Sequence, residues 1–204
     1  MTTFAIAAFS YVLGSIPFGF ILVRAFRGQD VRETGSGNIG ATNVARSSPA
    51  LGALTLVLDA LKGIAAVGLT QTFFPGQTLL AGVAALFAVL GHMFPIWLKL
   101  RGGKGVATGL GSFAILAPKS ILVTMGIFVA VVFLFRHVSL GSIVAVALFP
   151  VLAWLLRDYS DMPQLLAMMA MASLLIVARH RQNIGRLLAG TEPRLHWKRA
   201  SRQA

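Results

Sequence analysis

Two glycine-rich stretches carry the polar side chains whose types and spacing suit phosphate binding. The first, 33–46, reads ETGSGNIGATNVAR, and the second, 100–112, reads LRGGKGVATGLGS. Backbone amides exposed by glycines form anion-binding nests, and the N-terminus of a following helix adds a favourable dipole. Each stretch also brings a cation, Arg46 or Lys104. We therefore expect both stretches to bind phosphate, the alternative for the first being a flexible interhelical loop.

The candidate binding residues around these cations are small hydroxyl, amide and glycine residues. They are Ser36, Gly37, Asn38, Gly40, Thr42 and Asn43 in the first stretch, and Gly102, Gly103, Gly105 and Thr108 in the second. The second stretch is not a Walker A loop, because the pattern GxxxxGK[ST] is absent and glycine follows Lys104. Nucleotide hydrolysis is therefore not expected.

The composition places these stretches in an integral membrane protein. Of the 204 residues, 56% are hydrophobic and the mean hydropathy is +0.79, with apolar runs too long for a soluble core of this size. The chain has no cysteine, which excludes disulfides and thiolate chemistry. A net charge of +12 suggests nucleic acid in a soluble domain. Here, however, the cations follow the loops and lack an interleaved aromatic surface, so no nucleic-acid partner is expected.

The apolar pattern predicts one all-α domain, 1–204, as a polytopic bundle of about seven transmembrane helices. The predicted spans are 4–23, 51–70, 78–98, 107–117, 121–135, 139–156 and 163–178, followed by a basic tail, 179–204. The segment 107–135 fits either one long tilted helix or two short helices separated near Pro118.

The distribution of charge favours two helices in that region. Cationic loops stay in the cytoplasm, and with the split only Lys119 and Arg157 among the loop cations fall outside. The N-terminus is then outside and the C-terminus cytoplasmic. Both glycine-rich stretches, the turn at 136–142 and the basic tail share the cytoplasmic face. We expect the tail to contact lipid headgroups through Arg194, His196, Lys198 and Arg199.

Asp59 and Lys62 are the charges predicted within a span, and their spacing places them on one helical face. An unpartnered pair is costly in lipid. One interpretation is a salt bridge that orients the helix, and the other is support of the active site from beneath. His92, at the end of the third span, is either a structural interface residue or a ligand.

Three motifs taken together resemble one enzyme family. GSGNIGATNVAR, GHMFPIWLKLRGGKGVATG and RHRQNIGRLLAGTE occur in this order, with DALKG and SLGS between them. They resemble the acyl-phosphate-dependent glycerol-3-phosphate acyltransferases of bacterial membranes, the PlsY family. The resemblance implies acyl transfer from acyl phosphate to the 1-hydroxyl of sn-glycerol 3-phosphate, giving lysophosphatidic acid and phosphate. It implies no nucleotide, metal or other cofactor, and a multi-pass monomer in the inner membrane with a cytoplasmic active site.

The resemblance also ranks the site residues. By motif position the catalytic polar core is Ser36, Arg46, Lys104, Ser139 and Asn183, with His180 among the substrate-binding residues. Glu192 is a candidate either for the base or for a brace of the basic tail. The acceptor's own phosphate is a further candidate base, because a phosphate monoester has a second pKa of about 6.

A small organophosphate or anion transporter is the alternative function. Glycine loops and cations also suit translocation. Transporters of this kind commonly contain inverted repeats and broken central helices, and the sequence shows no convincing internal repeat.

Overall fold

The computed structural model describes residues 1–195, and within them the regular structure is helical. The expected headgroup contacts of His196, Lys198 and Arg199 lie outside this range. The α-helices are α1 (Thr2–Gly14), α2 (Phe18–Arg27), α3 (Ala41–Ser47), α4 (Pro49–Phe73), α5 (Thr78–Met93), α6 (Val106–Leu116), α7 (Pro118–Phe135), α8 (Val138–Leu155), α9 (Pro163–Arg179) and α10 (Arg181–Leu188). The described residues also contain two 3₁₀ turns, η1 (Val31–Glu33) and η2 (Ile96–Leu98).

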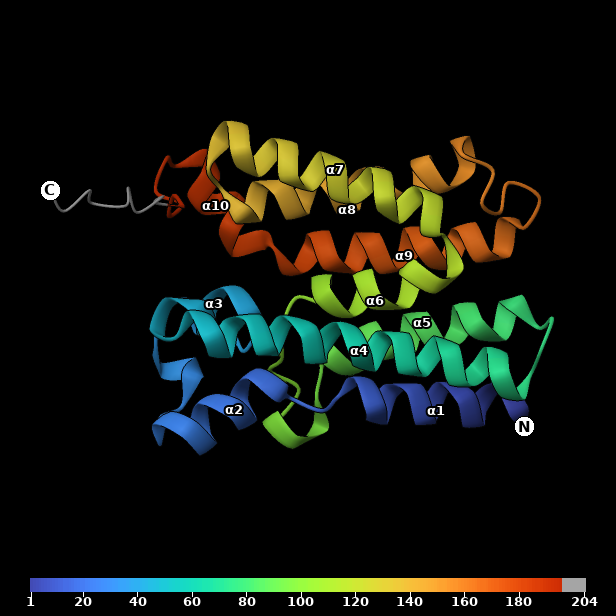
Figure 1. Ribbon diagram of the computed structural model, residues 1–204, viewed down its shortest axis with the longest axis horizontal. Helices are drawn as coiled ribbons and strands as arrows, with labels where there is room; N and C mark the ends of the chain where they lie inside the picture. The colour runs from blue at the N-terminus through green and yellow to red at the C-terminus, as the bar shows by residue number, and fades with distance from the viewer. Residues whose placement is uncertain (196–204) are drawn as a thin grey trace, which may run out of the picture.

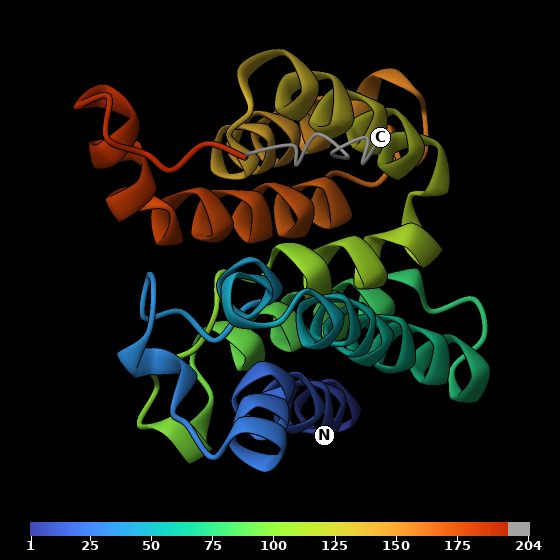
Figure 2. The same cartoon turned by 60° about the vertical axis from the view of Figure 1, so that its left-hand side comes forward.

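The long helices form two groups with α6 between them. Helices α7, α8 and α9 pack together on one side, and α1, α4 and α5 on the other (Figure 1). Helix α6 packs on α4 and α5 and leads into α7. The turned view shows α1 and α7 on opposite sides of the molecule (Figure 2). The cavity described below lies where α6 separates the groups.

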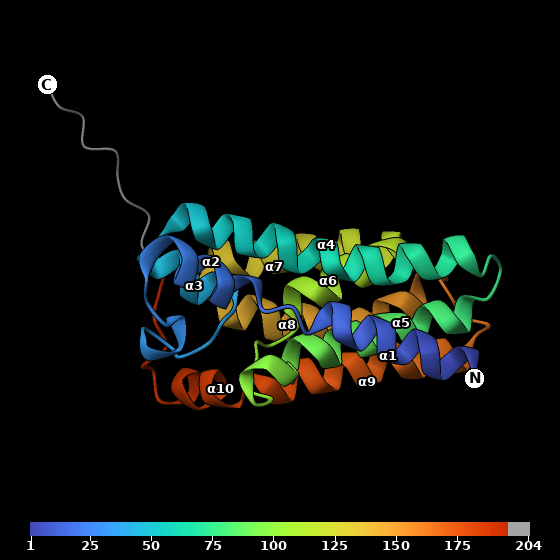
Figure 3. The ribbon, with the colours of Figure 1, turned by 90° about the horizontal axis from the view of Figure 1, so that it is seen from below.

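The helices run alternately between two ends of the bundle. One end carries α2, α3, α10 and the loop before α6, and the other carries the N-terminus and the α4–α5 connection (Figure 3). Lys119, in the first turn of α7, and Arg157, in the connection after α8, lie toward the second end, whereas Arg46 and Lys104 line one cavity nearer the first. The two glycine-rich stretches therefore meet at one end of the molecule.

The helix lengths support a polytopic membrane protein, as the composition predicted. Five segments in the described residues are long and apolar enough to cross a membrane, and α9 with α10 makes a sixth if this pair, bent by 56°, counts as one span. Helix α6 is the exception among the predicted spans. Its 11 residues extend about 16 Å, roughly half of a ~30 Å hydrocarbon core.

Helix boundaries differ from the predicted spans where proline and glycine act locally. The predicted span 4–23 is broken between Gly14 and Phe18, because Pro17 has no backbone N–H to donate. Residues 41–47, expected as loop, form α3, and 181–188 in the predicted tail form α10. Long apolar runs predict membrane spans, but they do not reveal amphipathic helices as short as α3 and α10.

Pro118 separates α6 from α7, in the region where the distribution of charge favoured two helices over one. Helix α6 ends at Leu116, and Pro118 is the first residue of α7. Proline suits this first position, where its missing N–H would have no intrahelical partner. The break turns the chain back, so α7 packs against α8 on the other side of the cavity.

Candidate active site

A cavity of about 680 Å³ opens between α3, α4, α6, α7, α8 and α9 at the end of the bundle where the glycine-rich stretches meet. It has a polar end and a longer apolar part. Most of the predicted site residues line it: Ser36, Asn38, Gly40, Thr42, Asn43, Arg46, Lys104, Gly105, Ser139, His180, Asn183 and Glu192. Four predicted residues, Gly37, Gly102, Gly103 and Thr108, are not part of its lining.

Asn43 holds the first glycine-rich stretch in shape. Its Oδ1 accepts a hydrogen bond from the Ser36 amide at 2.8 Å, and its Nδ2 donates to the carbonyls of Val31, Thr34 and Asn38 at 2.9–3.1 Å. Asn43 is 4% exposed. Its amide group is thus occupied by the loop's own backbone, which gives Asn43 a loop-shaping position beside its predicted place in the binding site.

Arg46 stands on the last turn of α3, exposed to solvent and lining the cavity. The helix that carries it begins at Ala41, directly after the glycine-rich turn. Because one short helix bears both Thr42 and Arg46 four residues apart, both side chains share a face. The first stretch therefore offers a cation and a hydroxyl to the same cavity.

The second stretch turns tightly around the end of α5. The Gly102 amide donates to the Met93 carbonyl at 3.1 Å and the Gly103 amide to the His92 carbonyl at 3.0 Å. Gly105 has φ +89, a left-handed conformation that favours glycine, and α6 begins at the next residue. Gly102 and Gly103 thus act behind the cavity wall and not in it, while Lys104 reaches the cavity.

Lys104 lies in the polar end without a hydrogen-bond acceptor or carboxylate within bonding distance among residues 1–195. Burial lowers the pKa of the Lys104 ammonium to about 8, since Arg186, Arg46 and Arg179 oppose the attraction of Glu192. A half-buried ammonium near three arginines is a position suited to an anionic ligand.

Glu192 joins Ser139 to α10. Its Oε1 accepts hydrogen bonds from Ser139 Oγ at 2.6 Å and Asn183 Nδ2 at 2.7 Å, and its Oε2 lies 2.7 Å from Arg186 Nε. Burial alone would raise the pKa of the Glu192 carboxyl, but these hydrogen bonds and the Arg186 charge lower it. The carboxylate is ionised and occupied, which fits the predicted brace better than the predicted base.

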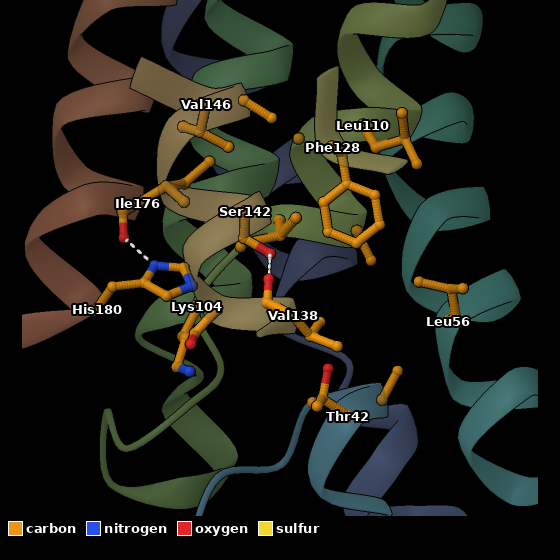
Figure 4. Close-up of a pocket in the computed structure, with 18 of the residues that line it drawn as sticks. Thr42, Leu56, Lys104, Leu110, Phe128, Val138, Ser142, Val146, Ile176 and His180 are labelled. Atoms are coloured by element: carbon orange, nitrogen blue, oxygen red, sulfur yellow. Dashed lines mark hydrogen bonds between the residues drawn. The ribbon is translucent and has the colours of Figure 1, made fainter. Parts of the chain in front are cut away.

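His180 faces Lys104 from the end of α9. Its Nδ1 lies 2.8 Å from the Ile176 carbonyl, so this nitrogen is the donor and Nε2 is left as an acceptor. Figure 4 shows the ring between Ile176 and Lys104, with Ser142 and Thr42 across the cavity. His180 and Lys104 therefore present an acceptor and a cation side by side.

Apolar side chains line the longer part of the cavity. Leu56, Leu110, Phe128 and Val146 border it (Figure 4). Its buried end contains Phe113 and Phe149, whose ring centroids lie 5.0 Å apart. Ten residues of α8 separate Ser139 from Phe149, a rise of about 15 Å. This depth corresponds to roughly half of the ~30 Å hydrocarbon core, the length available to one acyl chain in a leaflet.

Sequence reasoning missed several residues at this site. Arg194 lines the cavity, although we expected it only as a headgroup contact. Arg179 was counted only as part of the basic tail, yet it donates to the carbonyls of Gly102 and Gly103 at 3.1 and 3.3 Å. The position of Arg179 in the RHRQNIG motif, one residue before His180, was the available signal.

The known proteins that this chain resembles share one description, glycerol-3-phosphate acyltransferase. The family model described as glycerol-3-phosphate acyltransferase matches residues 4–190. The chain is 47% identical over 188 residues to the glycerol-3-phosphate acyltransferase of Mesorhizobium japonicum, covering 92% of this chain and 93% of that protein. It is 48% identical over 197 residues to the enzyme of the same name from Gluconobacter oxydans, covering 95% and 93%.

A solved structure extends the similarity to the fold. The crystal structure of PlsY, an integral membrane glycerol 3-phosphate acyltransferase, in its glycerol 3-phosphate form matches with a TM-score of 0.86 at 36% identity, over 96% of both chains. Its lysophosphatidic acid form gives the same TM-score at 34% identity. Because the family model matches residues 4–190 and the relatives cover more than nine tenths of the chain, the chain belongs to the glycerol-3-phosphate acyltransferase family.

Proposed function

We propose that the protein transfers a fatty acyl group from acyl phosphate to the 1-hydroxyl of sn-glycerol 3-phosphate, giving lysophosphatidic acid and inorganic phosphate. The observation that supports this most is one cavity with two environments. Its polar end holds Lys104, Arg46 and a hydroxyl-rich loop, and its other end is a long apolar pocket. Two phosphates and one acyl chain need this combination.

In this proposal the acceptor hydroxyl attacks the acyl carbonyl carbon, and the bond from that carbon to the phosphate oxygen breaks. Phosphate leaves with both electrons of that bond. Developing charge on the carbonyl oxygen needs fixed donors, and Ser36 and Thr42 lie in the same polar end. Ser139, Asn183 and Arg46 complete the proposed catalytic set, with positioning and charge stabilisation providing most of the rate.

The hydroxyl proton needs an acceptor, and we assign it to the phosphate of glycerol 3-phosphate. Glu192 already accepts three hydrogen bonds, and these bonds together with the Arg186 charge lower its pKa, which makes it a weak base. A phosphate dianion is available at neutral pH, because its second pKa is about 6. Acyl phosphate also has a good leaving group, which lowers the demand for a strong protein base.

The reaction is tested by incubating purified protein with palmitoyl phosphate and glycerol 3-phosphate. Lysophosphatidic acid and inorganic phosphate should appear in equal amounts. Protein that forms neither would refute the proposed reaction. Uptake of glycerol 3-phosphate into proteoliposomes without any acylated product would instead favour the transporter function.

The pH profile of the wild-type enzyme should fall on the alkaline side. Lys104 binds phosphate as an ammonium, and its pKa of about 8 means that this charge is present below pH 8 and lost above it. Since kcat/KM reports the free enzyme, its alkaline limb should have an apparent pKa near this value. In Lys104→Arg the limb should vanish from the same pH range, because guanidinium stays charged. An unchanged limb in that variant would assign it to another group.

Phe149 should set the preferred acyl-chain length. Replacing it by leucine deepens the apolar end beside Phe113 and should raise the kcat/KM ratio of octadecanoyl to tetradecanoyl phosphate by about tenfold, the order expected for methylene discrimination in a pocket. Phe133→Leu, at a 71% exposed site on α7, is the control and should leave the ratio unchanged. An unchanged ratio in Phe149→Leu would show that the acyl chain does not reach this end of the cavity.

We further propose a single domain, functional as a monomer, that crosses the bacterial inner membrane seven times. The N-terminus is outside, and the active site and C-terminus are cytoplasmic. Support comes from the alternating helices and from the cations around Arg46 and Lys104 at one end, because positive loops remain in the cytoplasm. In this arrangement α6 is a short crossing between the two helix groups.

Labelling of two engineered cysteines tests this orientation against the cysteine-free background. Gln77 and Gln29 are both exposed, in connections at opposite ends of the bundle. With intact cells, a membrane-impermeant maleimide should label Gln77→Cys and spare Gln29→Cys. After permeabilisation both should react. The reverse pattern would invert the orientation.

A further inference from the structure

Three buried polar side chains next to the polar end of the cavity have no part in the chemistry proposed above, although two of them, Asp59 and His92, belong to the cavity lining. Asp59 and Lys62 lie on α4, with Lys62 Nζ 2.8 Å from Asp59 Oδ1. His92 lies against both from the last turn of α5, and all three side chains are at most 3% exposed. Replacing a buried ion pair by apolar side chains is often neutral or stabilising. Stability alone therefore does not explain this cluster.

The hydrogen bonds of Lys62 determine how His92 is oriented. The Lys62 ammonium donates to the Ile16 carbonyl at 2.9 Å and lies 3.0 Å from His92 Nδ1, and it forms an ion pair with Asp59, whose Oδ1 is 2.8 Å away. Because an ammonium only donates, His92 Nδ1 accepts. In a neutral imidazole the hydrogen is then on Nε2. Asp59 and Lys62 thus fix both the ring position and its tautomer.

The other edge of the His92 ring meets the loop that carries Lys104. A Cβ added to Gly103 would overlap His92 Nε2, so the glycine backbone lies directly against the ring. The Gly103 amide also donates to the His92 carbonyl at 3.0 Å. The residue before Lys104 is therefore held by the side chain and the backbone of one histidine.

Arg179 holds the same loop from the opposite side. Its guanidinium donates to the Gly103 carbonyl at 3.3 Å and to the Gly102 carbonyl at 3.1 Å, and lies 5.3 Å from the Phe94 ring centroid. The loop is clamped between α5 and α9. A shift of the His92 ring would thus be transmitted to Lys104, the next residue after Gly103.

We propose that Asp59, Lys62 and His92 are positioning residues that set the location of Lys104 in the phosphate site. Asp59 and Lys62 hold the imidazole, the imidazole holds Gly103, and Gly103 determines where the Lys104 ammonium lies. The inference rests on the proposed function for the role of Lys104 in phosphate binding. It goes beyond that function by giving the buried charge pair a place in it.

A charge-neutral double variant tests the proposal kinetically. Asp59→Asn/Lys62→Met removes both charges together, so no unpaired buried charge remains. We expect KM for glycerol 3-phosphate or palmitoyl phosphate to rise at least about tenfold, as misplaced binding groups do, with a smaller change in kcat. The matched control is Ser120→Ala/Asp158→Asn, a hydrogen-bonded pair at the far end of the bundle. It should lower thermal stability and leave both constants unchanged. Wild-type KM and kcat in the first variant would overturn the proposal.

A second measurement does not depend on catalysis. Reductive methylation of Lys104, quantified by mass spectrometry against Lys119 in the same molecule, reports how well the loop is held. His92→Leu should label about threefold faster at Lys104, because the loop opens more often. His92→Asn keeps an oxygen that can accept from Lys62 but lacks the imidazole edge that contacts Gly103, so Lys104 should again label faster than in the wild type.

Equal Lys104 labelling in wild type, His92→Leu and His92→Asn would overturn the proposal, whether or not the double variant folds. Because labelling needs no turnover, failure of the acyl-transfer assay would refute the proposed reaction without deciding this point. Conversely, active enzyme with unchanged labelling would retain the reaction and remove the positioning role.

Discussion

Replacing Lys104 by alanine is expected to lower kcat/KM by about 100- to 1000-fold, the loss typical for removal of one preorganised charge-stabilising donor. Lys104 lies in the polar end of the cavity without an acceptor in bonding distance among the described residues. Its ammonium is therefore free for a substrate phosphate. The measurement is steady-state release of phosphate from palmitoyl phosphate by purified variants.

Expression and folding should survive this change. Lys104 follows the glycine turn and makes no described hydrogen bond that α6 needs, so the melting temperature should stay near that of the wild type. Lys119→Ala, an exposed lysine at the start of α7, is the matched control and should keep full activity. Wild-type turnover in Lys104→Ala would remove this residue from the catalytic set.

Replacing Gly111 by valine is expected to give the largest loss of stability, about 3 kcal/mol. A Cβ at Gly111 would overlap the Ala60 carbonyl, and one at Gly63 would overlap the Thr108 carbonyl. Helices α4 and α6 thus touch through their backbones, which cannot rotate away as a side chain can. For a chain of this size the melting temperature in detergent should fall by about 10 °C.

The control for this change is Gly126→Val. Gly126 lies in α7, and a Cβ there meets no atom within 4 Å, so the melting temperature should hardly change. Activity should also be lower in Gly111→Val than in Gly126→Val, because α6 follows the Lys104 loop and forms one wall of the cavity with α4. Equal melting temperatures for Gly111→Val and Gly126→Val would show that the two helices can separate without cost.

Local sequence was sufficient for the apolar helices and for the polar motifs. Long apolar runs must bury their backbone polar groups in lipid, and the helix does this within one segment. The glycine-rich stretches indicated candidate anion-binding residues because backbone conformation near glycine is a local property. Ser36, Arg46 and Lys104 could therefore be placed in a common site before any fold was known.

Local sequence could not show which glycines face the cavity and which lie behind it. Gly102 and Gly103 were expected to bind substrate, yet their amides donate to α5 carbonyls. The glycine-rich motif has the same sequence whether its amides bind a substrate or donate to a neighbouring helix. The partner of a backbone amide depends on the segment packed against it, and His92 lies ten or more residues away along the chain.

The sequence by itself determined an all-helical membrane protein, the polar stretches at its loops and the chemistry that these residues suit. Only the tertiary structure decided that Glu192 is occupied by Ser139, Asn183 and Arg186, and that His92 joins the Asp59–Lys62 pair. The physical reason is the range of the interactions. Hydropathy and glycine conformation act within a few residues, whereas these hydrogen bonds join residues on different helices, which meet only when the bundle has packed.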